Sequence, residues 1–306
     1  PRRSARPLPQ VQRHGPHRHA AGALPLPGMP GRGIAGAAMT DLALLPLGLS
    51  QTPPASPWGI NVGGGLNSTA VVLECRRRGF RPDWMLFADT GSERPETLEH
   101  VEVLRRWCEG WAELTTVRWV RKDGTFESLH DNCLRTEFLP SKAYGYSGCT
   151  TKWKVQPMER WRKAHGFDRG AFAVGYDAGE SRRIGRACQR GDDPNMVAWY
   201  PLVAWGIDRA GCQAIVDAAG MTVAKSSCFM CPNMKPPEWA ALKVEHPDLL
   251  AIAQSIAVRA IAAGNKPQAG RARYLEACLG VPDDYDIVDV TPLPEDDRCH
   301  HGGCFT

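Results

Sequence analysis

The sequence predicts an α/β protein with a doubly wound, Rossmann-like, mostly parallel β-sheet and a helical C-terminal subdomain. Short apolar runs alternate with helix-like patterns from Trp58 onward. One of these runs, Trp84–Ala88, is wholly apolar, which is typical of a strand buried on both faces of a parallel sheet. After Pro232 only helix-like patterns follow, separated by proline and glycine.

The expected elements follow one another in a regular order. A strand at Gly59–Val62 leads through glycines into a helix that ends near Arg78, where Gly79 and Pro82 interrupt the pattern. Proline and glutamate suit the first turn of the next helix, which begins at Pro95. Further strands are expected at Leu114–Val120, Ala171–Val174 and Trp199–Val203, and helices at Glu238–Val244, Pro247–Ala262 and Gly270–Leu279.

We expect the chain to divide into three regions. Residues 1–56 are rich in Arg, Pro, Gly, His and Ala without sustained periodicity, which favours disorder. The alternatives are an extension outside the natural coding sequence, with Met39 as the true start, and an Arg-rich targeting peptide. Residues 57–231 form the sheet domain, and residues 232–306 form the helical region and a tail.

Composition bounds the function. With 306 residues, 43% of them hydrophobic, the chain is long enough for one large domain or two small ones. The net charge of +4 suits an anionic small ligand and does not specifically indicate nucleic acid. No apolar run reaches membrane-spanning length, so we expect a cytoplasmic protein without a membrane partner. In a reducing compartment, eleven cysteines indicate metal binding or catalysis rather than disulfides.

The stretch after the first strand has the composition of a phosphate cradle. Glycines let consecutive backbone N–H groups point into one concavity, and the start of the following helix adds the positive end of its dipole. Short polar side chains then offer further hydrogen bonds to an anion. The alternative is a tight turn with a Ser/Thr cap. The candidate anion-binding residues are Gly63, Gly64, Gly65, Asn67, Ser68 and Thr69.

A second polar stretch, Asp89-Thr90-Gly91, follows the apolar strand Trp84–Ala88. Because the carboxyl ends of parallel strands meet at one edge of the sheet, Asp89 and the glycine stretch are expected to share a site. A carboxylate there would hold Mg²⁺ or a ribose hydroxyl. The alternative is an aspartate that only caps the turn.

Together these stretches resemble a known superfamily. Gly63–Ser68 is similar to the S-G-G-x-D-S loop of the adenine-nucleotide alpha-hydrolase (PP-loop ATP pyrophosphatase) superfamily, with Gly63 in place of Ser and Asn67 in place of Asp. Asp89–Thr97 resembles the D-T-G-x-x-x-P-E-T motif of its phosphoadenosine phosphosulfate reductase family. The resemblance implies a HUP-type fold that binds ATP or phosphoadenosine phosphosulfate.

Two later segments extend the resemblance to about Cys231. Val174–Asp177 with Glu180–Arg183 looks like the G-x-R/E-S-x-R segment of the family, in which Arg182 or Arg183 would clamp a nucleotide phosphate. Solvated surface arginines are the alternative. Tyr200–Trp205 resembles the P-L-x-x-W segment, which leads into a helix and a cysteine pair.

Four cysteines form a candidate metal-binding set: Cys149, Cys212, Cys228 and Cys231. The C-x-x-C pair at Cys228 and Cys231 fits one edge of a metal or iron–sulfur site, because two thiolates so spaced in a turn can face one ion. The set is similar to the four-cysteine pattern of the iron–sulfur branch of the family. A 4Fe-4S cluster, structural Zn²⁺ and buried unligated cysteines all remain open.

The resemblance and the motifs lead to two hypotheses of function. The first is an enzyme that either transfers sulfur or adenylates a substrate with release of pyrophosphate. Asp89 and Lys152 would be catalytic, with Lys152 stabilising developing phosphate charge, and a sulfur donor or thiol reductant would be the partner. The second is a non-catalytic nucleotide-binding or DNA-modification accessory protein, since Asn67 replaces the loop Asp. The weak match of Arg298–His301 to the catalytic E-C-G-x-H motif of the reductases argues against sulfonucleotide reduction.

Overall fold

A computed structural model describes residues 49–139, 148–180, 183, 195–231 and 233–264. These residues all belong to the compact unit that spans residues 44–306. The predicted helix Gly270–Leu279, the C-terminal tail and most of the N-terminal region lie outside them. None of the helices within the described ranges is long and apolar enough to cross a membrane.

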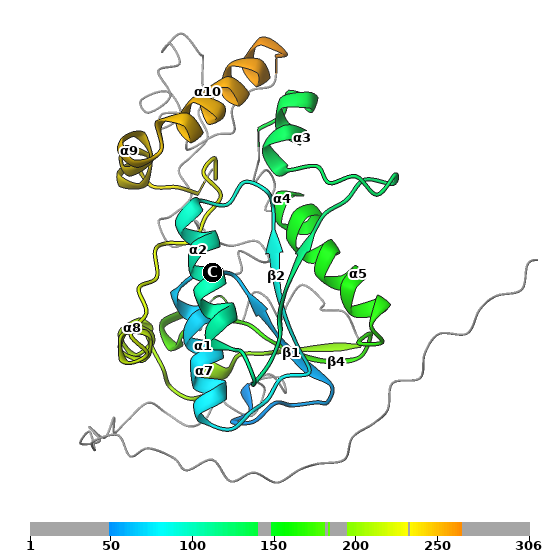
Figure 1. Cartoon of the computed structure of the whole chain (residues 1–306), viewed down its shortest axis with the longest axis vertical. Coiled ribbons are helices and arrows are strands. Elements are labelled where there is room, and N and C mark those ends of the chain that lie inside the picture. The colour runs from blue at the N-terminus through cyan, green and yellow to red at the C-terminus, as the bar shows by residue number, and fades with distance from the viewer. Residues whose placement is uncertain (1–48, 140–147, 181–182, 184–194, 232, 265–306) are drawn as a thin grey trace, which may run out of the picture. The chain divides into compact units, whose positions relative to one another are not determined.

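The centre of the fold is a five-stranded sheet in the order β3-β2-β1-β4-β5 (Figure 1). Each neighbouring pair of strands is parallel, so the predicted doubly wound α/β fold is confirmed. The chain runs from β1 outward to β3 and then returns to add β4 on the other side of β1. The strands are β1 (Trp58–Val62), β2 (Trp84–Asp89), β3 (Leu114–Arg118), β4 (Gly170–Ala173) and β5 (Met196–Trp199).

Helices cover both faces of the sheet. The helices around the sheet are α1 (Leu66–Arg77), α2 (Pro95–Trp107), α5 (Gln156–Ala164), α7 (Pro201–Ala204) and α8 (Arg209–Ala218). Those near the candidate site are α3 (Leu129–Thr136), α4 (Gly148–Thr150), the π-helix η4 (Thr151–Val155), the 3₁₀-helix η5 (Ala178–Glu180), α9 (Pro236–Glu245) and α10 (Pro247–Ala262).

Strand β2 shows why the sheet needs helices on both sides. Its side chains alternate between two separate cores, as the period of two in a strand requires. Met85 and Phe87 belong to the core that includes α1 and α8, whereas Leu86 and Ala88 join the core that includes Met158 of α5. A strand buried on both faces reads as a continuous apolar run, which is the pattern seen in the sequence.

The predicted strand Trp199–Val203 is wrong over most of its length. Strand β5 ends at Trp199, and Pro201 is the first residue of α7. The segment is apolar throughout, so periodicity alone cannot separate a strand from a short buried helix. Proline suits the first helical position because its fixed φ matches the helix and its missing N–H has no helical partner there.

Residues 49–56, which the sequence analysis assigns to the N-terminal extension, pack against the sheet domain. The indole Nε1 of Trp199 donates to the Ser50 carbonyl at 2.8 Å, and that of Trp205 donates to the Gln51 carbonyl at 3.0 Å. Leu49 and Ala55 lie against two of the hydrophobic cores. The folded domain therefore extends at least to residue 49 on its N-terminal side.

Helices α9 and α10 share a further core with α3. Trp239 and Leu242 of α9, Ile256 of α10 and Leu129 of α3 are buried together. Figure 1 shows α9, α10 and α3 at the end of the molecule toward which β2 points. The predicted helices Glu238–Val244 and Pro247–Ala262 are thus present, and they lie beside the carboxyl edge of the sheet.

Candidate functional site

The glycine loop joins β1 to α1. Gly64 has a φ of +75°, in the left-handed region that favours glycine. A Cβ at that position would lie 2.9 Å from Cγ2 of Thr97 on α2. Backbone conformation and close packing therefore both exclude a side chain at residue 64, and the tight turn from strand to helix depends on it.

The segment after β4 meets this loop at the point where the sheet topology reverses. The strands β2 and β4 lie on opposite sides of β1, and ligands of open α/β sheets bind at such switch points. A Cβ on Gly175 would lie 2.8 Å from the backbone N of Ser68. The chain after β4 therefore packs directly on the N-terminus of α1.

Asn67 lies at the centre of a buried polar network. Its Nδ2 donates to Oδ2 of Asp177 at 3.0 Å and to Oε2 of Glu180 at 3.2 Å, while its Oδ1 accepts from Nη1 of Arg209 at 2.9 Å. Asn67 is 2% exposed and Asp177 is 4% exposed. The amide therefore satisfies two carboxylates at once, which an aspartate at this position cannot do because it has no N–H to donate.

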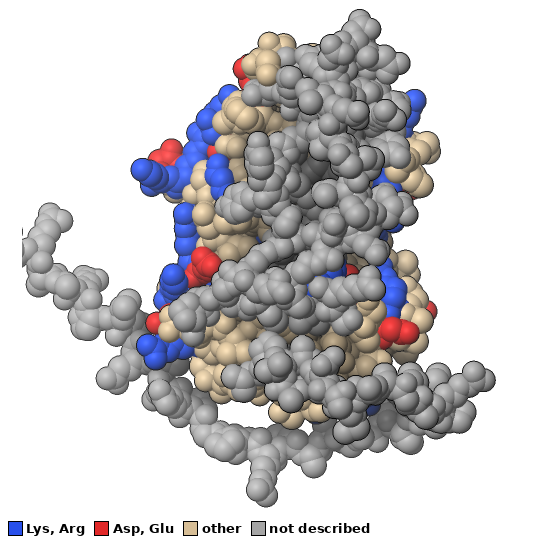
Figure 2. All heavy atoms as spheres, turned by 180° about the vertical axis from the view of Figure 1, so that it is seen from behind, with Lys and Arg blue, Asp and Glu red and all other residues tan. Residues whose placement is uncertain are grey.

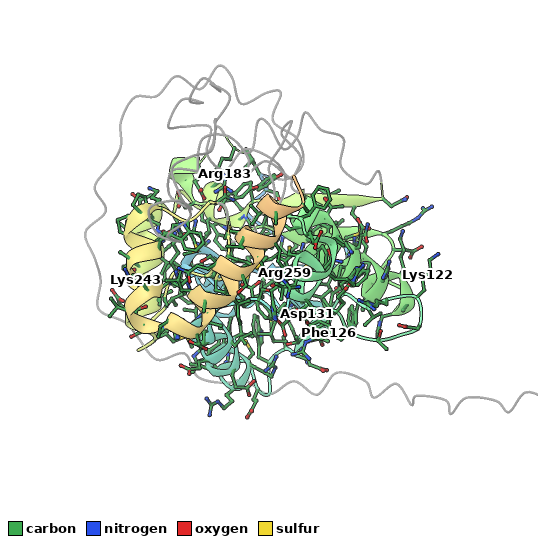
Figure 3. All side chains as sticks on the ribbon, turned by 90° about the horizontal axis from the view of Figure 1, so that it is seen from above. Lys122, Phe126, Asp131, Arg183, Lys243 and Arg259 are labelled. Atoms are coloured by element: carbon green, nitrogen blue, oxygen red, sulfur yellow. The ribbon has the colours of Figure 1, made fainter. Side chains whose placement is uncertain are left out.

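Arg183 and Arg209 supply positive charge at the same place. Arg183 forms an ion pair with Glu180, and its guanidinium carbon lies 4.5 Å from the ring centroid of Tyr176. Figure 3 looks from above and shows Arg183 on the opposite side of the molecule from Phe126 and Asp131. Arg182, the other predicted phosphate ligand, lies outside the described residues.

The two hydroxyls that follow Asn67 both bond to the carbonyl of Gly65. Ser68 Oγ donates to that oxygen at 3.0 Å, and Thr69 Oγ1 donates to it at 2.9 Å. Thr69 Oγ1 also lies 2.8 Å from Nε2 of His100, whose pKa is lowered by burial. The two hydroxyl hydrogen bonds thus stabilise the first turn of α1, and His100 of α2 contacts Thr69 from a second helix.

Asp89 ends β2, and both of its carboxylate oxygens have partners. Oδ1 accepts from the backbone N of Gly91 at 2.8 Å, and Oδ2 lies 2.7 Å from Nη2 of Arg118. Asp89 therefore caps the turn and pairs with β3, as well as lying at the carboxyl edge of the sheet. Thr90 and Gly91 continue this turn against residues 126–129.

A buried cluster next to Thr90 was missed by the sequence analysis. Glu93 has a side chain that is 1% exposed, and it pairs with Nζ of Lys154 at 3.1 Å. Cys228 Sγ donates to Glu93 Oε1 at 3.6 Å, and Thr90 Oγ1 lies 3.3 Å from that sulfur. A β-bridge between Glu93 and Cys228 fixes the two segments together. Thr90 and Cys228 were named as candidates, but Glu93 was not, and its only sequence signal was its place inside the second motif.

Lys152, the predicted catalytic lysine, has different neighbours from Lys154. Its Nζ lies 4.2 Å from the ring centroid of Trp119 and 4.1 Å from that of Trp153. Burial lowers the pKa of Lys152. Both lysines lie on the π-helix η4, and of the two it is Lys154 that reaches the buried carboxylate.

The structure brings three of the four predicted metal-binding cysteines into one core. Cys149, Cys228 and Cys231 belong to the core around α9 and α10, together with Cys133. Their sulfur atoms do not form a group within 4.8 Å among the described residues. Burial raises the pKa of Cys228 well above its usual value, so a bound cation would be needed to favour its thiolate form.

Cys212 lies elsewhere. It is fully buried in the core between α8 and α1, and its charged neighbours include Asp177 and Arg209. Burial raises the pKa of Cys212 to about 12. The fourth thiol in the core of Cys149 is instead Cys133, whose pKa is also raised to about 12, first by burial and then by Cys149.

On the face shown in Figure 2, the visible lysines and arginines lie mainly along the margins, with acidic side chains among them. The net charge of +4 suits a small anionic ligand.

No protein-family model matches the sequence, and no curated protein matches it. Among solved structures, the chain is similar to the U34-tRNA thiolase NcsA from Methanococcus maripaludis, determined with its 4Fe-4S cluster. The identity is 12% over 69% of this chain and 72% of that chain, with a TM-score of 0.34. A likeness at this level carries no argument about function, which has to come from the site itself.

Proposed function

We propose that this chain is an enzyme that binds an adenine nucleotide, either ATP or phosphoadenosine phosphosulfate, at the carboxyl edge of its sheet. The observation that carries the proposal is the position of the glycine loop. Gly63–Gly65 lead from the central strand into the N-terminus of α1, at the switch point between β1 and β4. Backbone N–H groups and a helix dipole at such a point favour an anion.

The residues around the loop support a phosphate ligand. Arg183 and Arg209 both reach the network of Asn67, so two guanidinium groups lie within reach of the same loop. Arginine presents several N–H donors in a fork that matches phosphate oxygens. In this proposal the loop amides bind the phosphates, and Arg183 with Arg209 neutralises their charge.

Two sets of carboxylates fit the Mg²⁺ that accompanies a nucleotide. Asp89 lies at the end of β2, but both of its oxygens already have partners. Asp177 and Glu180 contact residue 67 of the loop directly. Hard oxygen ligands of this kind suit Mg²⁺, which when bound would offset phosphate charge.

The reaction that we propose is sulfur transfer or adenylation with release of pyrophosphate. It rests on the order of the two motifs and on the thiols beside Thr90. The thiols of Cys149, Cys228 and Cys231 would hold a 4Fe-4S cluster or Zn²⁺, and an external sulfur donor or thiol reductant would be the partner. Lys154 pairs with Glu93, which contacts Cys228, so Lys154 replaces Lys152 as the proposed catalytic lysine.

A non-catalytic nucleotide-binding or accessory role is the second candidate. One observation favours it: the amide of Asn67 stands where the resembled loop has an aspartate, and it is held by three charged side chains. Release of pyrophosphate from ATP, measured with and without thiol acceptors, separates the two. An enzyme releases pyrophosphate from ATP, or adenosine bisphosphate from phosphoadenosine phosphosulfate, whereas an accessory protein binds the nucleotide and leaves it intact.

Binding is tested with one loop variant and a matched control. Gly64→Ala and Gly79→Ala both place a side chain on a backbone with positive φ, which costs about 1–2 kcal/mol. Only Gly64 has neighbours within contact distance, since a Cβ at Gly79 meets nothing within 4 Å. Titration of the full chain with ATP and with phosphoadenosine phosphosulfate should therefore show weaker binding in Gly64→Ala only. Equal affinities in both variants, or no binding by the wild type, would overturn the proposal.

A further inference from the structure

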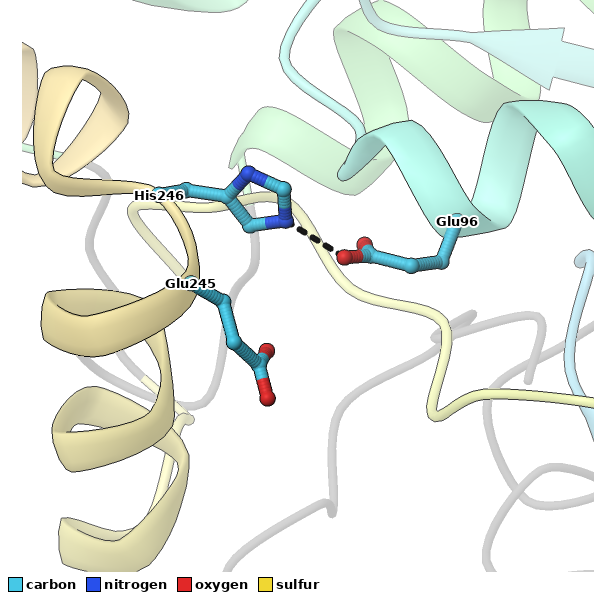
Figure 4. A group of neighbouring side chains, drawn as sticks. All are labelled: Glu96, Glu245 and His246. Carbon is cyan, nitrogen blue, oxygen red and sulfur yellow. Dashed lines mark hydrogen bonds and ion pairs between the residues drawn. The ribbon is translucent and has the colours of Figure 1, made fainter.

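Three potential metal ligands come together away from the glycine loop. Glu96 lies in the first turn of α2, Glu245 is the last residue of α9, and His246 separates α9 from α10. One donor atom from each of the three residues lies within 4.8 Å of the other two. Figure 4 shows His246 and Glu96 pointing toward each other, with Glu245 beside His246.

The existing contacts use only part of this donor set. Nε2 of His246 pairs with Oε1 of Glu96. The other oxygen of Glu96, Oε2, is buried and has no hydrogen-bond partner among the described residues. A buried polar atom without a partner is uncommon in a native fold and calls for an explanation, such as an ion or a water molecule.

The charges around the group also favour a cation. Two carboxylates whose oxygens lie within 4.8 Å of one another repel unless positive charge lies nearby. Arg94 is the nearby permanent cation that interacts with Glu96, and its Nη2 donates to the Glu238 carbonyl at 2.9 Å.

We propose that Glu96, Glu245 and His246 bind a divalent transition-metal ion of the Zn²⁺ type. An imidazole nitrogen with two carboxylate oxygens suits Zn²⁺ and its first-row neighbours, whereas Mg²⁺ and Ca²⁺ prefer oxygen ligands alone. The ion replaces the proton that otherwise joins His246 to Glu96, and water completes the coordination. None of the three ligands is a cysteine or a residue of the nucleotide loop.

The ion would act as a clamp between two parts of the fold. Glu96 belongs to a helix that packs on the sheet, and Thr97, the next residue, contacts the position of Gly64. Glu245 and His246 belong to the pair α9–α10. A ligand that binds only the folded arrangement stabilises it, so the metal should hold the C-terminal helices against α2.

Titration of the full chain with Co²⁺, under anaerobic conditions at neutral pH, tests the proposal. Cobalt is chosen because sulfur ligation gives intense near-ultraviolet charge-transfer absorption, which separates thiolate sites from a site of nitrogen and oxygen ligands. The variants are Glu245→Gln and His246→Asn, each of which removes one ligand. The controls are Glu99→Gln, which changes an exposed carboxylate on α2, the helix of Glu96, and His165→Asn, which changes an exposed imidazole.

The expected result is one cobalt ion per chain without sulfur charge-transfer absorption, together with a rise in melting temperature. Each ligand variant should bind this ion at least about tenfold more weakly and lose the rise, while both controls keep them. The proposal is overturned if the wild type binds cobalt only through thiolates, or if the ligand variants bind as tightly as the controls. In either case the contact of His246 with Glu96 is an ion pair and nothing more.

Discussion

At the scale of single residues, Asn67 is the most informative side chain. The sequence suggested that an amide in place of an aspartate signals a lost activity. The structure shows that the carboxylates stand on the facing segment instead, at Asp177 and Glu180. The amide thus suits this network, because a carboxylate there would have no N–H to donate to Asp177 and Glu180 and would repel both.

Asn67→Asp should therefore lower stability and nucleotide affinity together. The change removes the N–H donor that Asp177 and Glu180 share, and loss of a hydrogen bond to a charged group costs about 1.5–3 kcal/mol, so we expect a fall in the free energy of unfolding. The double variant Asn67→Asp with Asp177→Asn exchanges the two groups and should recover much of the loss. Chemical denaturation of the wild type, the single variants and the double variant forms the required cycle. If the double variant is no better than the sum of its parts, the two residues do not act on one another.

The two lysines of η4 give a second comparison between residues. Lys154 pairs with Glu93, whose side chain is 1% exposed, whereas Lys152 lies over two tryptophan rings. Lys154→Met leaves a buried carboxylate without its cation and should cost about 3–5 kcal/mol. Lys152→Met removes a contact worth about 1 kcal/mol. Similar losses in urea denaturation for the two variants would contradict this assignment.

At the scale of elements, the segment 49–56 behaves as part of the domain. It provides the carbonyl acceptors for the indoles of Trp199 and Trp205 and places Leu49 against a core. Both indoles belong to the region of β5 and α7, at the edge of the sheet. The segment is thus attached to this end of the sheet by two hydrogen bonds and by apolar contacts, which stabilise it.

Two truncations test the role of this segment. Removal of residues 1–48 should leave the melting temperature nearly unchanged, because that composition offers little apolar surface to bury. Removal of residues 1–56 should lower it by about 5 °C or more, since two hydrogen bonds of about 1 kcal/mol each and several apolar contacts are lost. Differential scanning calorimetry compares the two, and identical melting temperatures would show that residues 49–56 contribute nothing.

The elements also show where sequence reasoning succeeds. Strand β2 was predicted within a residue of both ends, and the start of α2 was predicted at Pro95, because a wholly apolar strand and a Pro-Glu helix start are local signals. The strand predicted at Trp199–Val203 failed because the apolar run continues from β5 into α7. The partners of Asn67 could not be predicted from the sequence, because Asp177 is 110 residues away along the chain. Only the pairing of β4 with β1 brings Asp177 close to Asn67.

At the scale of the whole molecule, the distribution of cysteines divides the candidate metal ligands. Cys149, Cys228 and Cys231 lie in the core of the C-terminal helices, and Cys212 lies in the core under α1. A metal centre built on the first three would join α4 to the segment before α9. Cys133 shares their core and is the candidate for a fourth ligand.

Metal analysis of anaerobically purified protein tests this division. Cys228→Ala and Cys231→Ala should lose the iron or zinc, because a thiolate ligand is removed from the set. Cys212→Ala should keep the metal in its folded fraction, and Cys133→Ala should lose it if Cys133 is the fourth ligand. Loss of metal in Cys212→Ala as well as in Cys228→Ala and Cys231→Ala would restore the original set of four ligands. Metal-free wild type that is folded, with freely titratable thiols, would reduce all of them to ordinary cysteines.

The order of strands has a consequence for folding of the protein during its synthesis on the ribosome. Strands β1, β2 and β3 are synthesised in succession and can pair at once, but β4 closes the other edge of β1 only after α3 and α5 have emerged. At about 5–20 residues per second, that edge stays open for several seconds. During this interval the central strand of the finished sheet is an exposed edge strand, so the nascent chain is most in need of chaperones before Gly170 is translated.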